Sequence, residues 1–182
     1  DGIDGIVSIH AVATGVASAV LLGMTGGPWG LPLCLAAAAA GFLLLNRPPA
    51  RMFMGDVGAH FIGFVLAATG IAGACAGLPL WMAGVLNGVF LFDTGYTLLR
   101  RAWRREDLLQ AHQKHLYQRL VRCGLSFGQV DAGVLALDAL LAASCLSFAL
   151  NRAGWGVLWL SVVVLALAAV VVFVERRDRC FG

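Results

Sequence analysis

Long apolar stretches are the feature that most restricts how this chain can fold. Of its 182 residues, 60% are hydrophobic and 13% are charged, whereas a soluble domain averages about 45–50% apolar and about 25% charged residues. Charged side chains this sparse cannot cover a globular surface in water, so we expect lipid to surround most of the chain. A helix crosses a bilayer with roughly 17–25 mostly apolar residues, and six stretches qualify: 6–22, 29–45, 58–76, 80–99, 130–150 and 155–174.

The predicted fold is an all-α, polytopic transmembrane helix bundle that forms one membrane domain over residues 1–182, because only helices satisfy their backbone groups internally in an open chain in lipid. Twelve of the 13 Lys and Arg residues fall in three segments: 46–57, 100–129 and the tail after 174. Cytoplasmic loops collect basic residues, so we predict that these segments and both chain ends face the cytoplasm. The basic residues lie beside spans, so the net charge of +3 does not indicate a nucleic-acid partner.

Two acidic residues begin the chain, in the run Asp1-Gly-Ile-Asp4-Gly. Carboxylates three residues apart share one face of a helix. At the mouth of a span they are able to hold Mg²⁺ or to face a phosphate through it, because Mg²⁺ takes oxygen ligands from carboxylates and substrate phosphates. The alternative is that these residues only cap the start of the helix.

The connection between the second and third spans combines basic, aromatic and acidic residues. Arg47 and Arg51 are able to attract an anionic substrate, and Asp56 stands where the third span begins. Free N–H groups at a helix N-terminus favour phosphate oxygens, so Asp56 is a candidate ligand for a divalent metal beside a phosphate. The alternatives are a helix cap for Asp56 and an interfacial anchor for Phe53.

The loop 100–129 carries a histidine motif, with His112, Lys114 and His115 within four residues. These side chains donate the hydrogen bonds that phosphate oxygens accept, so the motif predicts a phosphate-binding cluster. Two histidines without a cysteine at a ligand spacing do not indicate zinc. The alternative is a basic loop that meets anionic lipid head groups.

Among the ionisable residues inside the predicted spans, Asp93, Asp138, His10 and His60 stand out. A carboxylate within a membrane span indicates a functional site by default, which applies to Asp93 near the predicted cytoplasmic interface. For Asp138 we favour a structural role with a polar partner, and for His10 and His60 we expect hydrogen bonds between helices. The rival interpretation is a transporter or channel with Asp93 and Asp138 along its path, but it leaves the block 53–58 and the histidine loop without a role. A third interpretation is a non-catalytic membrane scaffold.

Three blocks, 1–6, 41–58 and 112–120, together resemble the polyprenyl-phosphate N-acetylhexosamine-1-phosphate transferase superfamily. The run Pro49-Ala-Arg-Met-Phe-Met-Gly-Asp-Val-Gly58 is highly specific. The run His112-Gln-Lys-His-Leu-Tyr-Gln-Arg-Leu120 is more similar to the N-acetylglucosamine and O-antigen branch than to the peptidoglycan branch, which usually carries adjacent histidines. The resemblance implies an enzyme of the bacterial inner membrane with about eleven spans, of which this chain is a C-terminal fragment that is inactive alone.

By this resemblance, the enzyme transfers a sugar 1-phosphate from a UDP-N-acetylhexosamine to undecaprenyl phosphate in the membrane lipid and releases UMP. It requires Mg²⁺ or Mn²⁺, its active site faces the cytoplasm, and a homodimer is a further expectation. A phospho-N-acetylmuramoyl-pentapeptide transferase of the peptidoglycan branch is the alternative. The implied residues are Asp1, Asp4, His112 and His115 at the reacting phosphates; Asn46, Arg51, Phe53 and Lys114 for substrate binding, with Asn46 and Phe53 at the uracil; and Asp56 for the metal.

The charge distribution leads to a prediction about topology. A cysteine introduced at position 78 should react with a membrane-impermeant reagent from outside the cell, whereas cysteines at positions 50 and 110 should react only from the cytoplasm. The reason is the confinement of 12 of the 13 basic residues to one side. External labelling of position 110 would contradict the orientation and, with it, the location of the site.

Overall fold

The computed structural model describes residues 2–105 and 115–181, and side chains as far as residue 177. Every regular element in this part is a helix, which confirms the predicted all-α class. The helices are α1 (Ile6–Thr25), α2 (Gly30–Asn46), α3 (Gly55–Cys75), α4 (Trp81–Leu86), α5 (Gly88–Trp103), α6 (Leu116–Arg122), α7 (Phe127–Ala149) and α8 (Ala153–Phe181).

Four of these helices are long and apolar enough to cross a membrane: α1, α3, α7 and the stretch Ala153–Arg177 of α8. Helix α2 is also apolar, but its 17 residues put it at the short end of what spans a bilayer. The chain is therefore a multi-pass membrane protein, as predicted. The helices extend beyond several predicted boundaries, since α1 continues to Thr25 and α7 already begins at Phe127.

The prediction of one continuous span over 80–99 is wrong, because the helix is interrupted at Asn87 between α4 and α5. The Asn87 side-chain amide donates to the carbonyl oxygen of Ala83, one turn earlier (Nδ2···O 2.9 Å). Asn side chains compete in this way with the helix backbone, and glycine, which follows as Gly88, weakens a helix further. Membrane helices tolerate such breaks where neighbouring helices satisfy the polar groups.

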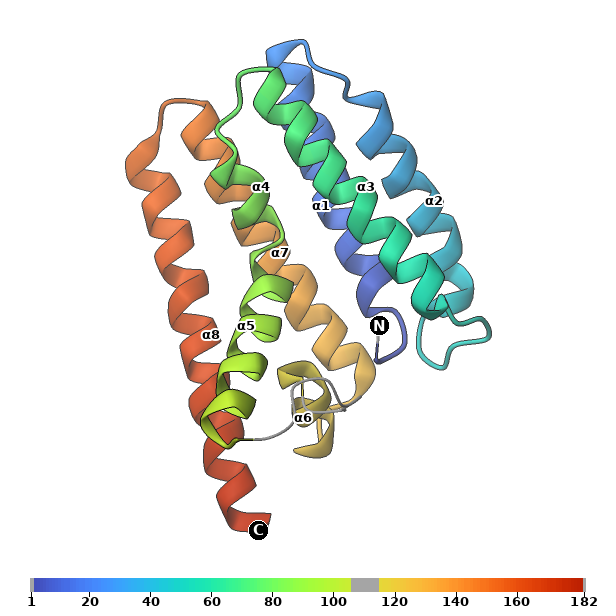
Figure 1. The fold of residues 1–182 in the computed structure, drawn as a ribbon, viewed down its shortest axis with the longest axis vertical. Helices are drawn as coiled ribbons and strands as arrows, with labels where there is room; N and C mark the ends of the chain where they lie inside the picture. Colours follow the sequence, from blue (N-terminus) through green and yellow to red (C-terminus); the bar gives the residue numbers. More distant parts are fainter. Residues whose placement is uncertain (1, 106–114, 182) are drawn as a thin grey trace.

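Helix α1 occupies the centre of the bundle and packs against α2, α3 and α7, while α8 lies along α7 at the edge (Figure 1). In the most apolar 18-residue stretch of α1, 50% is buried inside the bundle, compared with 11% in that of α8. Helices α1 and α2 approach closely at Gly15, where a Cβ atom would lie 2.8 Å from the carbonyl oxygen of Pro32. Small residues at such contacts allow the backbones of membrane helices to pack closely.

Buried polar side chains connect α1, α7 and the break between α4 and α5. His10 Nδ1 lies 2.8 Å from Asp138 Oδ2, and His10 Nε2 lies 3.2 Å from Asn87 Oδ1. These contacts confirm the helix–helix hydrogen bonds predicted for His10 and the polar partner predicted for Asp138. The same prediction was wrong for His60, whose Nδ1 atom lies 2.6 Å from the carbonyl oxygen of Asp56 in its own helix. Asp56 is one helical turn before His60, so its carbonyl is within reach of the imidazole ring.

The segments with the predicted site residues meet at one end of the bundle. The start of α1, the loop between α2 and α3, helix α6 and the end of α8 all lie at this end (Figure 1). We call it the site end. The chain returns to the same end after every second crossing, and this brings the segments together. Residues from all of them can therefore contribute to one site.

Substitution of Asp138 tests the buried contacts. Asp138→Ala should lower the free energy of unfolding by about 1–3 kcal/mol, because it leaves His10 Nδ1 buried without a partner. The double variant His10→Leu/Asp138→Leu should lose less than the sum of its single variants, because it removes both polar groups. Thermal unfolding in detergent measures both, with Ser161→Ala on the exposed face of α8 as control. Additive losses would contradict the pairing.

Candidate functional site

The acidic block 2–5 forms the turn that leads into α1. Asp1 lies outside the described residues. Gly5 has φ +88° just before α1 begins, and the left-handed region is open to glycine at little cost. Asp4 is half-buried, and its Oδ2 atom accepts a hydrogen bond from the backbone N–H of Ala50 (2.9 Å). One predicted catalytic carboxylate is therefore attached to the loop between α2 and α3.

The side chain of Asn46, at the end of α2, joins the same two segments. Its Oδ1 atom accepts hydrogen bonds from Gly5 N (3.1 Å) and Ser8 Oγ (2.9 Å), and its Nδ2 atom donates to the carbonyl oxygen of Met52 (3.0 Å). Only 2% of Asn46 is exposed. A buried amide bonded in this way fixes the start of α1, the end of α2 and the loop after it relative to one another. We refer to these contacts as the Asn46 clasp.

The loop held by the clasp presents its substrate-binding candidates to solvent. Arg51 and Phe53 are exposed, and Phe53 exposes 73% of its surface. Asp56 is exposed in the first turn of α3, whose start has no side-chain cap. The cap interpretation for Asp56 is therefore not supported, and its carboxylate remains open to a ligand.

His115 stands immediately before α6, while His112 and Lys114 lie outside the described residues. Asp93 Oδ1, on α5, accepts hydrogen bonds from the backbone N–H of Leu116 (2.8 Å) and from Thr97 Oγ1 (3.1 Å), and His115 Nδ1 is 3.5 Å from the same oxygen. Asp93 is 7% exposed. The intramembrane carboxylate thus fixes the start of α6, and with it the backbone at the histidine.

The acidic block and α6 touch directly. A Cβ atom on Gly2 would collide with the amide of Gln118 and lie 2.7 Å from the Tyr117 hydroxyl. The Tyr117 ring stacks on His115, with centroids 5.4 Å apart. Burial, with a smaller contribution from the Asp93 charge, raises the pKa of Tyr117 to about 12, so its hydroxyl keeps its proton at neutral pH.

Asp131, in the second turn of α7, is a further acidic residue at the site end that the sequence analysis did not single out. It is 3% exposed, and neither carboxylate oxygen has a hydrogen-bond partner within the described part of the chain. A Cβ atom on Gly5 would lie 2.7 Å from Asp131 Oδ2, so the carboxylate packs against the acidic block. The available sequence signal was its position at the entrance of a predicted span, close to a basic loop.

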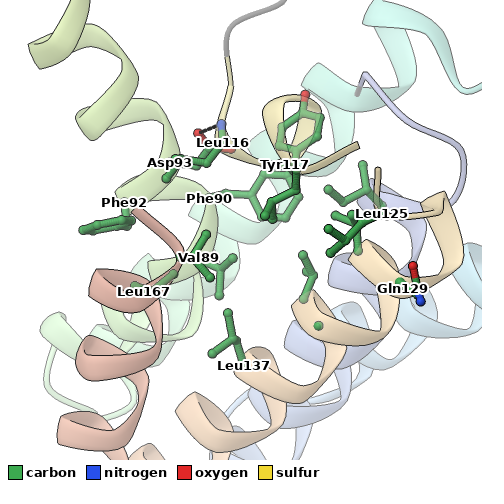
Figure 2. A pocket seen from close by; sticks show the side chains of 16 residues that line it. Val89, Phe90, Phe92, Asp93, Leu116, Tyr117, Leu125, Gln129, Leu137 and Leu167 are labelled. Carbon is green, nitrogen blue, oxygen red and sulfur yellow. Dashed lines mark hydrogen bonds between the residues drawn. The ribbon is translucent and has the colours of Figure 1, made fainter. Parts of the chain in front are cut away.

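An apolar cavity of about 190 Å³ lies between α5, α6, α7 and α8, just below the site (Figure 2). Its wall includes Phe90, Leu116, Leu137 and Leu167, and Asp93 lies on its border. An apolar space beside a polar constellation suits a molecule with a hydrocarbon part and an anionic head.

The arrangement suits a metal ion that binds together with an anionic substrate more than a metal ion held by the protein alone. Within residues 2–105 and 115–177, no three His, Cys, Asp or Glu side chains gather closely enough to hold a metal ion. Mg²⁺ commonly binds through one or two carboxylates together with substrate phosphates and water. The open carboxylate of Asp56 at a helix N-terminus fits that mode, since phosphate oxygens are favoured there.

Comparisons with known proteins agree with these motifs. The model of the family described as glycosyl transferase family 4 matches residues 1–74, the part that contains Asp4, Asn46 and Asp56. This match and the relatives below confirm the predicted resemblance, and residues 1–74 carry the signature of this family.

Particular relatives are similar over more of the chain. A Bacillus subtilis protein named "probable undecaprenyl-phosphate N-acetylglucosaminyl 1-phosphate transferase" is 30% identical over 132 residues, which are 69% of this chain and 37% of the relative. A phospho-N-acetylmuramoyl-pentapeptide-transferase of Synechococcus elongatus is 34% identical over 163 residues, which are 80% of this chain and 41% of the relative. The chain thus spans about two fifths of the length of these relatives, which belong to one superfamily.

The Asn46 clasp leads to a prediction. Asn46→Ala removes three hydrogen bonds at once, two of them buried, so it should lower the free energy of unfolding by at least about 1–3 kcal/mol. The loop should also become more mobile, so trypsin should cleave faster after Arg51. Mass spectrometry of the cleavage product and thermal unfolding measure the two effects, with Leu44→Ala, an exposed position on α2, as control. Equal cleavage rates in the two variants would show that the clasp does not order the loop.

Proposed function

We propose that the full-length protein transfers a sugar 1-phosphate of the N-acetylhexosamine type from a UDP-sugar to undecaprenyl phosphate and releases UMP. One observation carries the proposal. The acidic block is fastened on one side to the loop that leads to Asp56, through Asp4 and Asn46, and touches α6 beside His115 on the other. Three blocks far apart in the sequence thus converge, and the two named relatives support the reaction class.

The chemistry suits such a convergence. Two anionic phosphates must approach each other, and phosphoryl transfer depends mainly on positioning and electrostatic stabilisation. The lipid phosphate is itself the nucleophile, so no protein nucleophile is needed. His115, with His112 and Lys114 of the same motif, donates hydrogen bonds to phosphate oxygens, and Arg51 attracts the anionic substrate. Phe53 stacks on the uracil. Asn46, also expected at the uracil, is buried and its amide is bonded within the chain, so in this proposal it positions the loop on which Phe53 stands.

A metal ion completes the proposed site. Asp56 would hold Mg²⁺ or Mn²⁺ together with phosphate oxygens, and the ion would reduce the repulsion between the two phosphates. In this proposal the carboxylate of Asp4, with that of Asp1 from the same block, serves the reacting phosphates. The Ala50 N–H that bonds to Asp4 fixes the direction of that carboxylate.

The acceptor lipid accounts for the position of the site at one end of a membrane bundle. A polyprenyl phosphate carries an anionic head on an apolar chain, and the cavity beside Asp93 offers an apolar wall (Figure 2). We propose that the site end faces the cytoplasm, where UDP-sugars are available. The distribution of basic residues supports this orientation.

The sugar is the finer part of the proposal. The run from His112 to Leu120 favours the N-acetylglucosamine and O-antigen branch over the peptidoglycan branch. The relatives include members named for both branches, so the pentapeptide substrate is the second candidate. A transporter is disfavoured because Asp93 and Asp138 are engaged in contacts within the bundle.

A transfer assay tests the function. Membranes with the full-length protein, radiolabelled UDP-sugars and undecaprenyl phosphate should give a labelled lipid and an equal amount of UMP. The panel includes UDP-N-acetylglucosamine, UDP-N-acetylfucosamine, UDP-N-acetylquinovosamine and the UDP-N-acetylmuramoyl-pentapeptide. Transfer from the pentapeptide alone would move the protein to the peptidoglycan branch, and no transfer from any donor would refute the proposal.

A single substitution tests the metal role. Asp56→Asn keeps the size of the side chain and removes its charge, so Mg²⁺-dependent transfer should fall by at least about 10²–10³, the usual cost of one lost electrostatic contact in a transition state. Thermal unfolding should change little, because the helix-terminal charge is worth only about 0.3–1 kcal/mol. Wild-type turnover at all Mg²⁺ concentrations would leave Asp56 without a metal role.

A further inference from the structure

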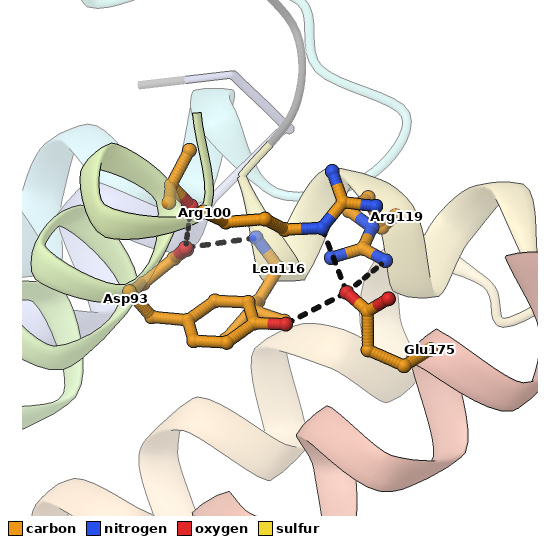
Figure 3. A network of polar contacts seen from close by, with 7 residues as sticks. Asp93, Arg100, Leu116, Arg119 and Glu175 are labelled. Atoms are coloured by element: carbon orange, nitrogen blue, oxygen red, sulfur yellow. Dashed lines mark hydrogen bonds and ion pairs between the residues drawn. The ribbon is translucent and has the colours of Figure 1, made fainter. Parts of the chain in front are cut away.

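Glu175, near the end of α8, connects three helices at the site end (Figure 3). Its Oε1 atom accepts hydrogen bonds from the Tyr96 hydroxyl (2.7 Å) and Arg100 Nε (2.7 Å) on α5, and from Arg119 Nη2 on α6 (2.8 Å). Two of the three bonds join a carboxylate to a guanidinium, and charge-assisted bonds of this kind are about twice as strong as neutral ones. We call this group the Glu175 hub.

The two arginines of the hub are sheltered from solvent, whereas the side chain of Glu175 exposes 26% of its surface. Arg119 is 3% exposed, and the side chain of Arg100 exposes 12% of its surface. Loss of one partner from a buried ion pair leaves an uncompensated charge, which is far more costly than loss of a surface pair. The arrangement of α5, α6 and α8 at this end is therefore sensitive to the carboxylate of Glu175.

Helix α6 depends on such contacts because it has seven residues. Isolated helices shorter than about 12–15 residues are marginal in water. The N-terminus of α6 is held by Asp93 through Leu116 N, its middle by Glu175 through Arg119, and its end by Arg177 of α8, which donates to the carbonyl oxygen of Cys123 (2.8 Å). Two of these three attachments come from α8.

The face of α6 held in this way is part of the proposed site. His115 directly precedes it, and Tyr117 and Gln118 abut Gly2 of the acidic block. A small rotation of α6 would therefore change the distance between the histidine and the acidic residues. Phosphoryl transfer is sensitive to such displacements, because the catalysis consists largely of positioning.

We propose that Glu175 is a positioning residue, which fixes α6 and its histidine against the acidic block through Arg119, and that the end of α8 is thereby part of the catalytic apparatus. This inference rests on the proposed function. It extends the site beyond the region that matches the family, since residues 1–74 do not include α5, α6 or α8. Glu175 touches no substrate in this role and acts only through the helix that it holds.

The test compares Glu175→Gln with Arg176→Gln in the full-length protein. The neighbouring Arg176 is exposed, so its substitution changes the charge of the same turn without touching the hub. Hydrogen exchange of the backbone amides 116–123, followed by mass spectrometry, reports on α6 independently of activity. Glu175→Gln should raise this exchange by about tenfold or more, as expected for the loss of one charge-assisted hydrogen bond, and Arg176→Gln should leave it unchanged.

Kinetics separate positioning from general stability. Glu175→Gln should lower kcat per folded molecule by about tenfold, the same free energy expressed in the rate, and leave the KM for the UDP-sugar near the wild-type value, because the proposed uracil contacts lie on another loop. Tyr96→Phe, which removes one donor from the hub, should give a smaller change in the same direction. Glu175→Asp should restore part of both losses, because it retains the charge.

The outcomes are distinguishable. Unchanged exchange of α6 in Glu175→Gln would overturn the hub as the support of α6. Faster exchange with unchanged kcat would leave Glu175 as a purely structural support of α6 and overturn its positioning role. If the wild-type protein transferred no sugar phosphate at all, the proposed function would fail together with the positioning role, while the exchange data would still decide whether Glu175 holds α6.

Discussion

The Asn46 side chain is the contact on which the geometry of the site end depends. It accepts hydrogen bonds from the start of α1 and donates to the loop after α2. Both segments are irregular, and backbone groups at the edge of a membrane bundle need defined partners. A single buried amide supplies acceptor and donor at once, which no apolar side chain of that size can do. The direction of Asp4 and the start of the loop toward Asp56 follow from it.

Polar residues inside the bundle hold its helices together through hydrogen bonds. His10, Asp138 and Asn87 link three helices around the interruption between α4 and α5. The interruption separates α5 from α4, and α5 carries Asp93 and Arg100 to the site end. Asp93 then uses its carboxylate to start α6. An acidic residue in a membrane span thus gains its importance by holding another element in place.

Two sides of the bundle contribute to the site, and they are connected through the acidic block. Helices α1, α2 and α3 supply Asp4, the loop and Asp56, while α5, α6 and α8 supply the setting of His115. Gly2 abuts α6 and Gly5 abuts Asp131, so residues 2–5 lie between the two sides. A side chain at Gly2 would have to displace the side-chain amide of Gln118.

The sequence by itself determined the membrane environment, the helical class and the end at which the motifs gather, because hydrophobic length and the parity of the spans are read along the chain. It also indicated His10 and Asp138 as structural residues. It missed the break at Asn87, the packing of Asp131 and the role of Glu175. The break at Asn87 has a local cause, the contact of its amide with Ala83 and the glycine that follows, which hydropathy alone does not reveal. Only the tertiary structure decided the other two, because the partners lie far apart in the sequence, 75 positions for Arg100 and Glu175 and 56 for Arg119 and Glu175, and helix packing alone brings such residues together.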